Sequence, residues 1–154
     1  MKNVAKLLAA GLSLTLAAGA ALAQAKPEDQ IRFRQGGYAF MAWNMGKIKA
    51  NLDGQYNKDQ VAAAANAVAA VANSGMGALF SPGTDKGKGF HETNVKPEFF
   101  KEGDKVKELA MAYIKEANEL AKVAATGDAA AVKVQFGKTG ESCKACHDKF
   151  RKDL

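Results

Sequence analysis

Cysteine and proline are scarce in this chain of 154 residues, which has two cysteines and three prolines. Paired carboxylates and a nucleophile with an adjacent base are also missing, so we expect no enzyme. The formal net charge of +6 is mild and dispersed along the chain, which does not indicate a nucleic-acid-binding protein. No alternation of apolar and polar residues extends over a useful length. The sequence therefore favours an all-α fold.

The first 23 residues have the composition of an export signal. Lys2 and Lys6 give a basic start, residues 7–22 form an apolar run, and Ala21 and Ala23 are small where a signal peptidase cleaves. A transmembrane anchor is the alternative, but the run is short for a bilayer and rich in alanine and glycine. We therefore predict a periplasmic protein with no membrane attachment after cleavage.

Cleavage before Gln24 leaves a single domain. Residues 24–154 contain no linker or low-complexity break, and their number is sufficient for a core without disulfides. Cleavage before Lys26 also satisfies the preference for small residues, and the choice touches no functional residue. We expect residues 1–23 to be removed and residues 24–154 to fold as one unit.

Apolar residues recur every three or four positions in four stretches, as in amphipathic helices. The expected helices cover residues 27–54, 57–82, 106–127 and 128–150. Residues 81–97 are rich in Gly, Lys and Pro and predict a long crossover. Two short connections and one long one indicate an antiparallel four-helix bundle. Because much of the apolar surface is alanine, a large apolar prosthetic group would supply the burial that the side chains lack.

Particular residues mark the ends of these helices. Pro27 suits a first helical turn, and Asn57 and Gln60 have the spacing of a capping box. Gly127 closes the third helix and Asp128 can cap the fourth. The inward face of the second helix is expected to run from Val61 through Gly75 to Leu79, with Pro82 as its stop.

The segment Cys143-Lys144-Ala145-Cys146-His147 matches the C-x-x-C-H pattern of covalent haem attachment. On a helix, these three functional positions share one face, so two thiols can reach the haem vinyl groups while the imidazole points to the iron. The alternatives are a zinc half-site, a redox dithiol and a plain disulfide. Zinc would need a fourth ligand, and a thioredoxin-type dithiol needs a preceding strand. A disulfide leaves His147 unexplained.

Any second axial ligand must come from upstream of the motif, because few residues follow it. The candidates, each of which is more often an ordinary core or loop residue, are Tyr38, Met41, Met45, Met76, His91 and Met111.

Two arginines are candidates for contact with the haem. Arg34 occupies the apolar seam of the first helix, where a buried guanidinium needs an anion. A haem propionate could accept two parallel hydrogen bonds from it. The alternative is a side chain that snorkels to water. Arg151 could similarly meet a propionate, lie over the imidazole, or be solvated.

Taken together, these residues resemble the cytochrome c' family, the class II c-type cytochromes, over essentially the whole mature chain. The matching pieces are Lys26-Pro27-Glu28-Asp29, Arg34-Gln35 followed by Met41 and Gly46, Phe80-Ser81-Pro82-Gly83-Thr84, and the haem motif with Asp148, Phe150 and Arg151. The resemblance implies one covalent haem c per chain in a four-helix bundle, usually a homodimer. It also implies five-coordinate iron whose closed distal pocket binds nitric oxide or carbon monoxide.

The resemblance also assigns roles to individual residues. Cys143 and Cys146 would hold the haem, His147 would ligate the iron, and Arg34 and Gln35 would lie near the propionates. Met41 and Phe80 would lie along the haem face. Tyr38 occupies the slot over the vacant iron face, where low-spin relatives of the c-556 type carry a ligating methionine. Two departures from the family pattern are the pair Gly36-Gly37 and the bulky Trp43.

The leading hypothesis from the sequence is thus a periplasmic, five-coordinate haem protein that binds nitric oxide and carbon monoxide, with electron transfer to unidentified redox proteins as a secondary role. A six-coordinate, low-spin electron carrier of the c-556 type is the alternative, and a helical binding module without haem is a third.

Overall fold

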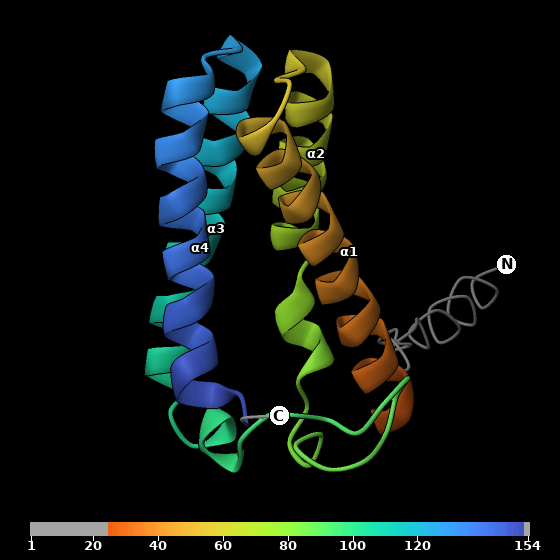
Figure 1. The fold of residues 1–154 in the computed structure, drawn as a ribbon. Coiled ribbons are helices and arrows are strands. Elements are labelled where there is room, and N and C mark those ends of the chain that lie inside the picture. Colours follow the sequence, from red (N-terminus) through yellow and green to blue (C-terminus); the bar gives the residue numbers. More distant parts are fainter. Residues whose placement is uncertain (1–24, 153–154) are drawn as a thin grey trace, which may run out of the picture.

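The computed structural model describes residues 25–152, so the predicted export signal and Gln24 lie outside the described residues. Four helices dominate this part of the chain: α1 (Pro27–Asp53), α2 (Lys58–Ala72), α3 (Gly103–Thr126) and α4 (Ala129–Phe150) (Figure 1). Two short 3-10 helices, η1 (Met76–Leu79) and η2 (Pro97–Phe100), lie between α2 and α3. Residues 25–152 contain two isolated β-bridges and no longer strand. The predicted all-α, four-helix fold is confirmed.

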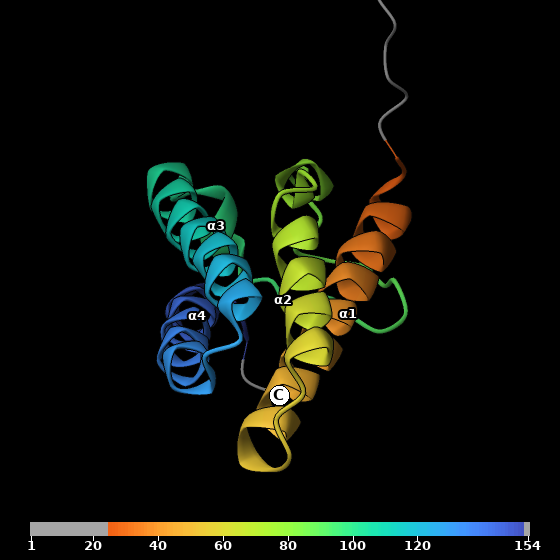
Figure 2. The same cartoon turned by 90° about the horizontal axis from the view of Figure 1, so that it is seen from above.

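Each helix packs against the next one along the chain, whereas α1 and α4 touch at few positions. Seen from above, α3 and α4 lie together on one side of the molecule, with α2 and α1 on the other (Figure 2). No helix within residues 25–152 has both the length and the apolar character needed to cross a membrane.

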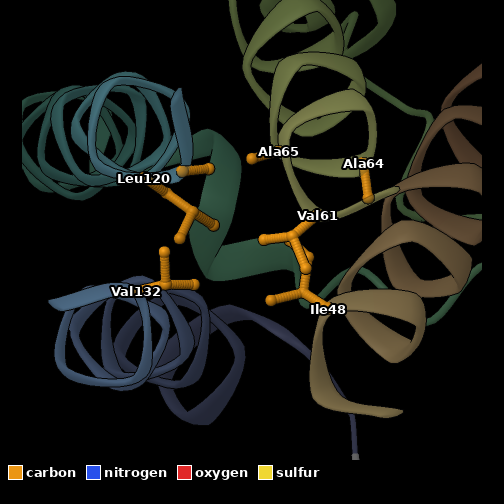
Figure 3. Packing of buried hydrophobic residues seen from close by; sticks show 7 residues of the cluster. Ile48, Val61, Ala64, Ala65, Leu120 and Val132 are labelled. Carbon is orange, nitrogen blue, oxygen red and sulfur yellow. The ribbon is translucent and has the colours of Figure 1, made fainter. Parts of the chain in front are cut away.

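The hydrophobic core lies toward the end of the bundle that has the two short connections. Its main cluster unites Ile48 of α1, Val61 of α2, Leu120 of α3 and Val132 of α4, all fully buried (Figure 3). A second cluster around Val68 continues it along α2 and α3. Much of the remaining core is alanine, as the sequence indicated. The opposite end of the bundle carries the C-terminal turns of α4 and the long connection between α2 and α3 (Figure 1).

Side chains cap two of the helices where the sequence predicted it. Asn57 Oδ1 accepts a hydrogen bond of 3.0 Å from the backbone N–H of Gln60, and Asp128 Oδ1 caps the first turn of α4. The capping box is only half formed, because Asn51 Oδ1 accepts from the Asn57 N–H and takes the place expected for Gln60. Gly127 adopts φ 80°, the left-handed conformation that closes α3.

The predicted end of the second helix at Pro82 is wrong, because α2 ends at Ala72. The side chain of Asn73 donates to Ala69 O at 2.6 Å and to Asn118 Oδ1 at 2.7 Å, and these bonds hold the last turn against α3. Gly75 then adopts φ 81°, which redirects the chain into η1. Consequently Gly75 and Leu79 do not continue the inward face of α2.

The structure accounts for one of the two consecutive glycines of α1. A Cβ atom at Gly37 would lie 2.9 Å from Cε and 3.1 Å from Sδ of Met76, so glycine lets η1 approach α1 closely. At Gly36 the nearest atom would be a ring carbon of Phe90 at 3.6 Å, an ordinary contact distance. The Met76 side chain, a candidate axial ligand from the sequence, therefore packs on Gly37.

Candidate functional site

The haem motif occupies the last turns of α4. Cys143 and Cys146 are half-buried and are not joined in a disulfide, and burial raises the pKa of both thiols. His147 follows them on an exposed part of the helix; partial burial of its ring lowers its pKa, Arg151 lowers it further, and Asp148 opposes the change. The motif thus presents two unpaired thiols and an imidazole at one end of a helix.

Tyr38 of α1 lies close enough to the motif for its hydroxyl group to interact with it. Burial of that group raises the pKa of Tyr38 to about 12; Cys146 and Cys143 raise it as well, while Arg34 lowers it. The residue as a whole is 43% exposed. The placement of Tyr38 over the iron stays a prediction.

Tyr113 of α3 is a site residue that the sequence analysis missed. Its hydroxyl group donates a hydrogen bond of 2.8 Å to the sulfur of Met41, and Cys143 and Tyr38 both raise its pKa, which burial raises most. Met41 is buried in α1 as predicted, with its sulfur engaged by this donor. The apolar spacing within residues 106–127 gives no indication of a partner for Tyr113 on α1.

The other methionine candidates have separate surroundings. Met45 packs against both core clusters, and Met111 is 57% exposed on α3.

Arg34 is buried, with 3% of its surface exposed, so the snorkelling alternative is wrong. Its Nη1 donates to Leu79 O at 3.1 Å and to Thr84 Oγ1 at 2.8 Å, while Nη2 donates to Thr84 O and, at 2.7 Å, to Thr93 Oγ1. Burial lowers the pKa of Arg34, and Tyr38 and Asp85 oppose this shift. Neutral oxygens thus use all four terminal N–H groups, so a two-pronged contact with a propionate would have to displace one of these bonds if it used Nε and a terminal nitrogen, or two if it used both terminal nitrogens.

Gln35 also binds the long connection. Its Oε1 accepts from the N–H of Phe90 at 2.8 Å, and its Nε2 donates to His91 O at 2.9 Å. Gly89 makes this approach feasible, because a Cβ atom there would lie 2.6 Å from both Arg32 N and Gln35 Oε1. His91, another candidate axial ligand from the sequence, is exposed in the connection and is tied to α1 by these bonds.

Phe80 joins the residues of α1 to those near α4. Its ring lies under the Arg34 guanidinium, with Cζ 4.5 Å from the centroid, and meets Tyr38 edge to face with centroids 6.5 Å apart. Phe80 also stacks on Phe99 at 4.6 Å, and Phe99 meets Phe150 at the end of α4 at 5.6 Å. The connection between α2 and α3 therefore contributes Phe80 to the surroundings of the motif. Arg34 contacts the Phe80 ring from α1, and Phe99 stacks on it.

Arg151 ends α4 and is exposed. Its backbone N–H donates to His147 O at 2.9 Å, and its charge is near enough to lower the pKa of that imidazole. Its exposure is compatible with the solvated alternative, and its positions over the imidazole or near a propionate stay predictions.

These residues fit a covalently attached haem. Two free thiols and an imidazole at one end of α4 have the spacing that attachment and axial ligation require. Aromatic and sulfur-containing side chains lie nearby, outside the main hydrophobic cluster: Tyr38, Met41, Phe80 and Tyr113. Within the described part of the chain, no three His, Cys, Asp or Glu side chains are grouped so that they could hold a metal ion.

Comparison with known proteins gives a consistent result. The model of the family described as "Cytochrome C'" matches residues 29–151. The cytochrome c' of Rhodocyclus tenuis is 64% identical over 83% of this chain and 97% of its own, and that of Allochromatium vinosum is 58% identical over 98% and 99%.

Solved structures agree with the sequence relatives. A cytochrome c' described as having an unusual ligand-controlled dimer dissociation superposes with a TM-score of 0.81 and 59% identity, over 84% of this chain and 98% of its own. A ferrous variant of cytochrome c' from Alcaligenes xylosoxidans with bound NO superposes with a TM-score of 0.74 and 30% identity, over 84% and 98%.

Proposed function

Because this chain belongs to the cytochrome c' family, whose members bind haem c, we propose that it is a five-coordinate haem protein that binds nitric oxide and carbon monoxide. Cys143 and Cys146 would hold the haem through thioethers, and His147 would ligate its iron. The haem iron supplies the bond to the diatomic gas. The polypeptide holds the haem and controls access to its other face.

The observation that carries this proposal is the position of Tyr38. It reaches toward the motif from α1 in the slot where a six-coordinate relative would present a methionine, and its raised pKa keeps the hydroxyl group neutral. A neutral phenol is a poor iron ligand. Met41, one turn further along α1, has its sulfur bonded to the Tyr113 hydroxyl group. The arrangement therefore favours vacant iron covered by Tyr38 over the c-556-type electron carrier.

The absorption spectrum of the reduced protein, before and after addition of carbon monoxide, tests this proposal. We expect a high-spin spectrum that changes when the gas binds. A low-spin spectrum that carbon monoxide leaves unchanged would establish the six-coordinate electron carrier instead. Tyr38→Ala should accelerate carbon monoxide binding, whereas Tyr38→Met should create a low-spin, six-coordinate form. If Tyr38 only packs the core, the alanine variant will lose stability with unchanged ligand kinetics.

Covalent attachment is tested by mass spectrometry under denaturing conditions. The thioethers should keep one haem on the mature chain after unfolding, and loss of the haem to solvent would refute the attachment. His147→Ala should leave both thioethers in place but alter the iron spectrum, because the axial imidazole is removed.

The exposed aromatic residues of α1 support a homodimer. Phe33, Phe40 and Trp43 are 56%, 49% and 58% exposed, and Phe40 and Trp43 stack with centroids 5.8 Å apart. Large apolar side chains grouped on one helix surface are typical of an interface between subunits. The similar cytochrome c' with ligand-controlled dimer dissociation is in accord with this assembly.

The proposed location of the mature protein is the periplasm, on the basis of the export signal in residues 1–23. We propose that the haem binds diatomic gases and, secondarily, transfers electrons. We do not propose a catalysed reaction.

A further inference from the structure

The crossover segment, which we define as residues 79–96, joins two helices that otherwise hardly touch. On one side, Arg34 and Gln35 of α1 bind it through the hydrogen bonds described above. On the other side, the N–H of Lys96 donates to Phe150 O and the N–H of Lys152 donates to Asn94 O, each at 2.8 Å. Figure 1 shows this segment passing beneath the bundle from α1 toward the C-terminal end of α4.

Arg34 is the centre of the α1 attachment. Its terminal nitrogens contact Leu79 and Thr84 near the start of the segment and Thr93 near its end, so a single side chain draws the two ends of the segment together. The oxygens that accept these bonds are neutral, and Thr84 and Thr93 are themselves buried. Arg34 therefore holds a backbone segment in place through its two terminal nitrogens. Nε makes none of these bonds.

The same attachment fixes Phe80. Arg34 binds the carbonyl group of Leu79, the preceding residue, and its guanidinium covers the Phe80 ring. Phe80 in turn contacts Tyr38. Release of the crossover segment from Arg34 would leave Phe80 with its stacking contact to Phe99 but without the Arg34 contact, so its ring would be held less firmly against Tyr38.

We propose that Arg34 is a positioning residue for gas binding: by fastening the crossover segment to α1, it holds Phe80 against Tyr38 and thereby limits access to the iron. This inference rests on the proposed function, because it presumes that Tyr38 covers a vacant iron face. The proposed role differs from a contact with a haem propionate. In that case Arg34 would act on the haem directly, and Thr84 and Thr93 would have no effect on gas binding.

Thr93→Val tests this role without altering Arg34. Valine keeps the shape of threonine but cannot accept the hydrogen bond from Nη2, whereas the control Thr93→Ser retains the accepting oxygen. In the haem-loaded protein we expect Thr93→Val to raise the carbon monoxide association rate about fivefold, which corresponds to ~1 kcal/mol, and Thr93→Ser to stay near wild type. Trypsin should also cleave the valine variant faster after the exposed Lys86 and Lys88.

The outcomes separate the hypotheses. If Thr93→Val becomes sensitive to trypsin but binds carbon monoxide at the wild-type rate, the segment does not control access and the inference is wrong. If only Arg34→Lys changes the protein, through a shifted reduction potential, Arg34 acts on a propionate and the inference is also wrong. If wild type binds no carbon monoxide, the proposed function itself fails. Should Thr93→Val not fold, Thr84→Val against Thr84→Ser provides the same comparison.

Discussion

The hydroxyl group of Tyr113 donates a hydrogen bond to the sulfur of Met41, with the two atoms 2.8 Å apart. This bond joins α3 to α1 across the end of the bundle where the haem motif lies, although these helices are not neighbours in the chain. It also gives the half-buried phenol of Tyr113 a hydrogen-bond partner, since burial of a hydroxyl group without one is costly. The contact therefore contributes both to stability and to the position of Met41.

Replacement of Tyr113 by phenylalanine should lower the free energy of unfolding by about 0.5–1.5 kcal/mol, because one buried hydrogen bond is lost with little change in shape. Tyr56→Phe is the matched control. The Tyr56 hydroxyl group is buried with no hydrogen-bond partner in the described residues, so its removal should be neutral or stabilising. Urea unfolding of both variants checks this pair. Equal losses would show that the Tyr113–Met41 bond contributes nothing specific.

The two glycines Gly37 and Gly46 should respond differently to alanine. In a helix interior alanine is favoured over glycine by about 1 kcal/mol, and no atom lies within 4 Å of a Cβ at Gly46, so Gly46→Ala should raise the free energy of unfolding by up to that amount. Gly37→Ala must displace the end of the Met76 side chain, which offsets the gain. Thermal unfolding should rank Gly46→Ala above Gly37→Ala. The reverse order would mean that Met76 moves aside at no cost.

Periodicity was sufficient to predict the four helices and the ends marked by Pro27, Asn57, Gly127 and Asp128, because these signals are local. It failed at the end of α2, where an alanine-rich pattern continues past Ala72. The features that end this helix are a side chain bonded to α3 and a glycine with positive φ. Neither is encoded in the apolar spacing.

Some residues of the candidate site could likewise be predicted from local signals, and others could not. The expected roles of Cys143, Cys146 and His147 follow from a short motif, whereas the expected place of Tyr38 comes from the resemblance to the family. The partners of Arg34 could not be predicted, because Thr84 and Thr93 lie in a segment without periodicity and reach α1 only when the crossover folds back. A buried guanidinium indicated that acceptors exist, but its position alone could not distinguish a propionate from backbone and threonine oxygens.

The exposed aromatic residues of α1, Phe33, Phe40 and Trp43, form a surface that we call the aromatic face. A charge introduced there should change the oligomeric state. Trp43→Glu places a charge beside Phe40, where Lys47 now covers the indole ring at 4.7 Å. We expect sedimentation velocity to show a shift of the haem-loaded protein from dimer to monomer, because the desolvation of a carboxylate at an interface opposes association even when Lys47 is nearby. Val134→Glu is the control, since Val134 is 61% exposed on α4, outside this face. A dimer that tolerates Trp43→Glu but not Val134→Glu would place the interface on α4.

Tyr38 should make the folded protein sensitive to alkali. Its pKa is about 12 in the folded protein against an ordinary value of 10.0, mainly because burial disfavours the phenolate. Below about pH 10, both the folded and the unfolded chain keep this proton, so the residue adds no pH dependence.

Between about pH 10 and about pH 12 the unfolded chain releases the Tyr38 proton while the folded chain still binds it, so the free energy of unfolding falls as the pH rises. Tyr113, whose pKa burial also raises, acts in the same direction. Thioether formation removes the thiolate contributions to the Tyr38 shift but leaves burial, its largest cause. Phenylalanine cannot ionise, so Tyr38→Phe should lose less stability than wild type between about pH 9 and about pH 11 in urea unfolding of the haem-loaded protein. Identical losses in the two proteins would show that the Tyr38 hydroxyl group is as well solvated in the folded state as in the unfolded one, and a hydroxyl group in that environment could not serve as a closed cover over the iron.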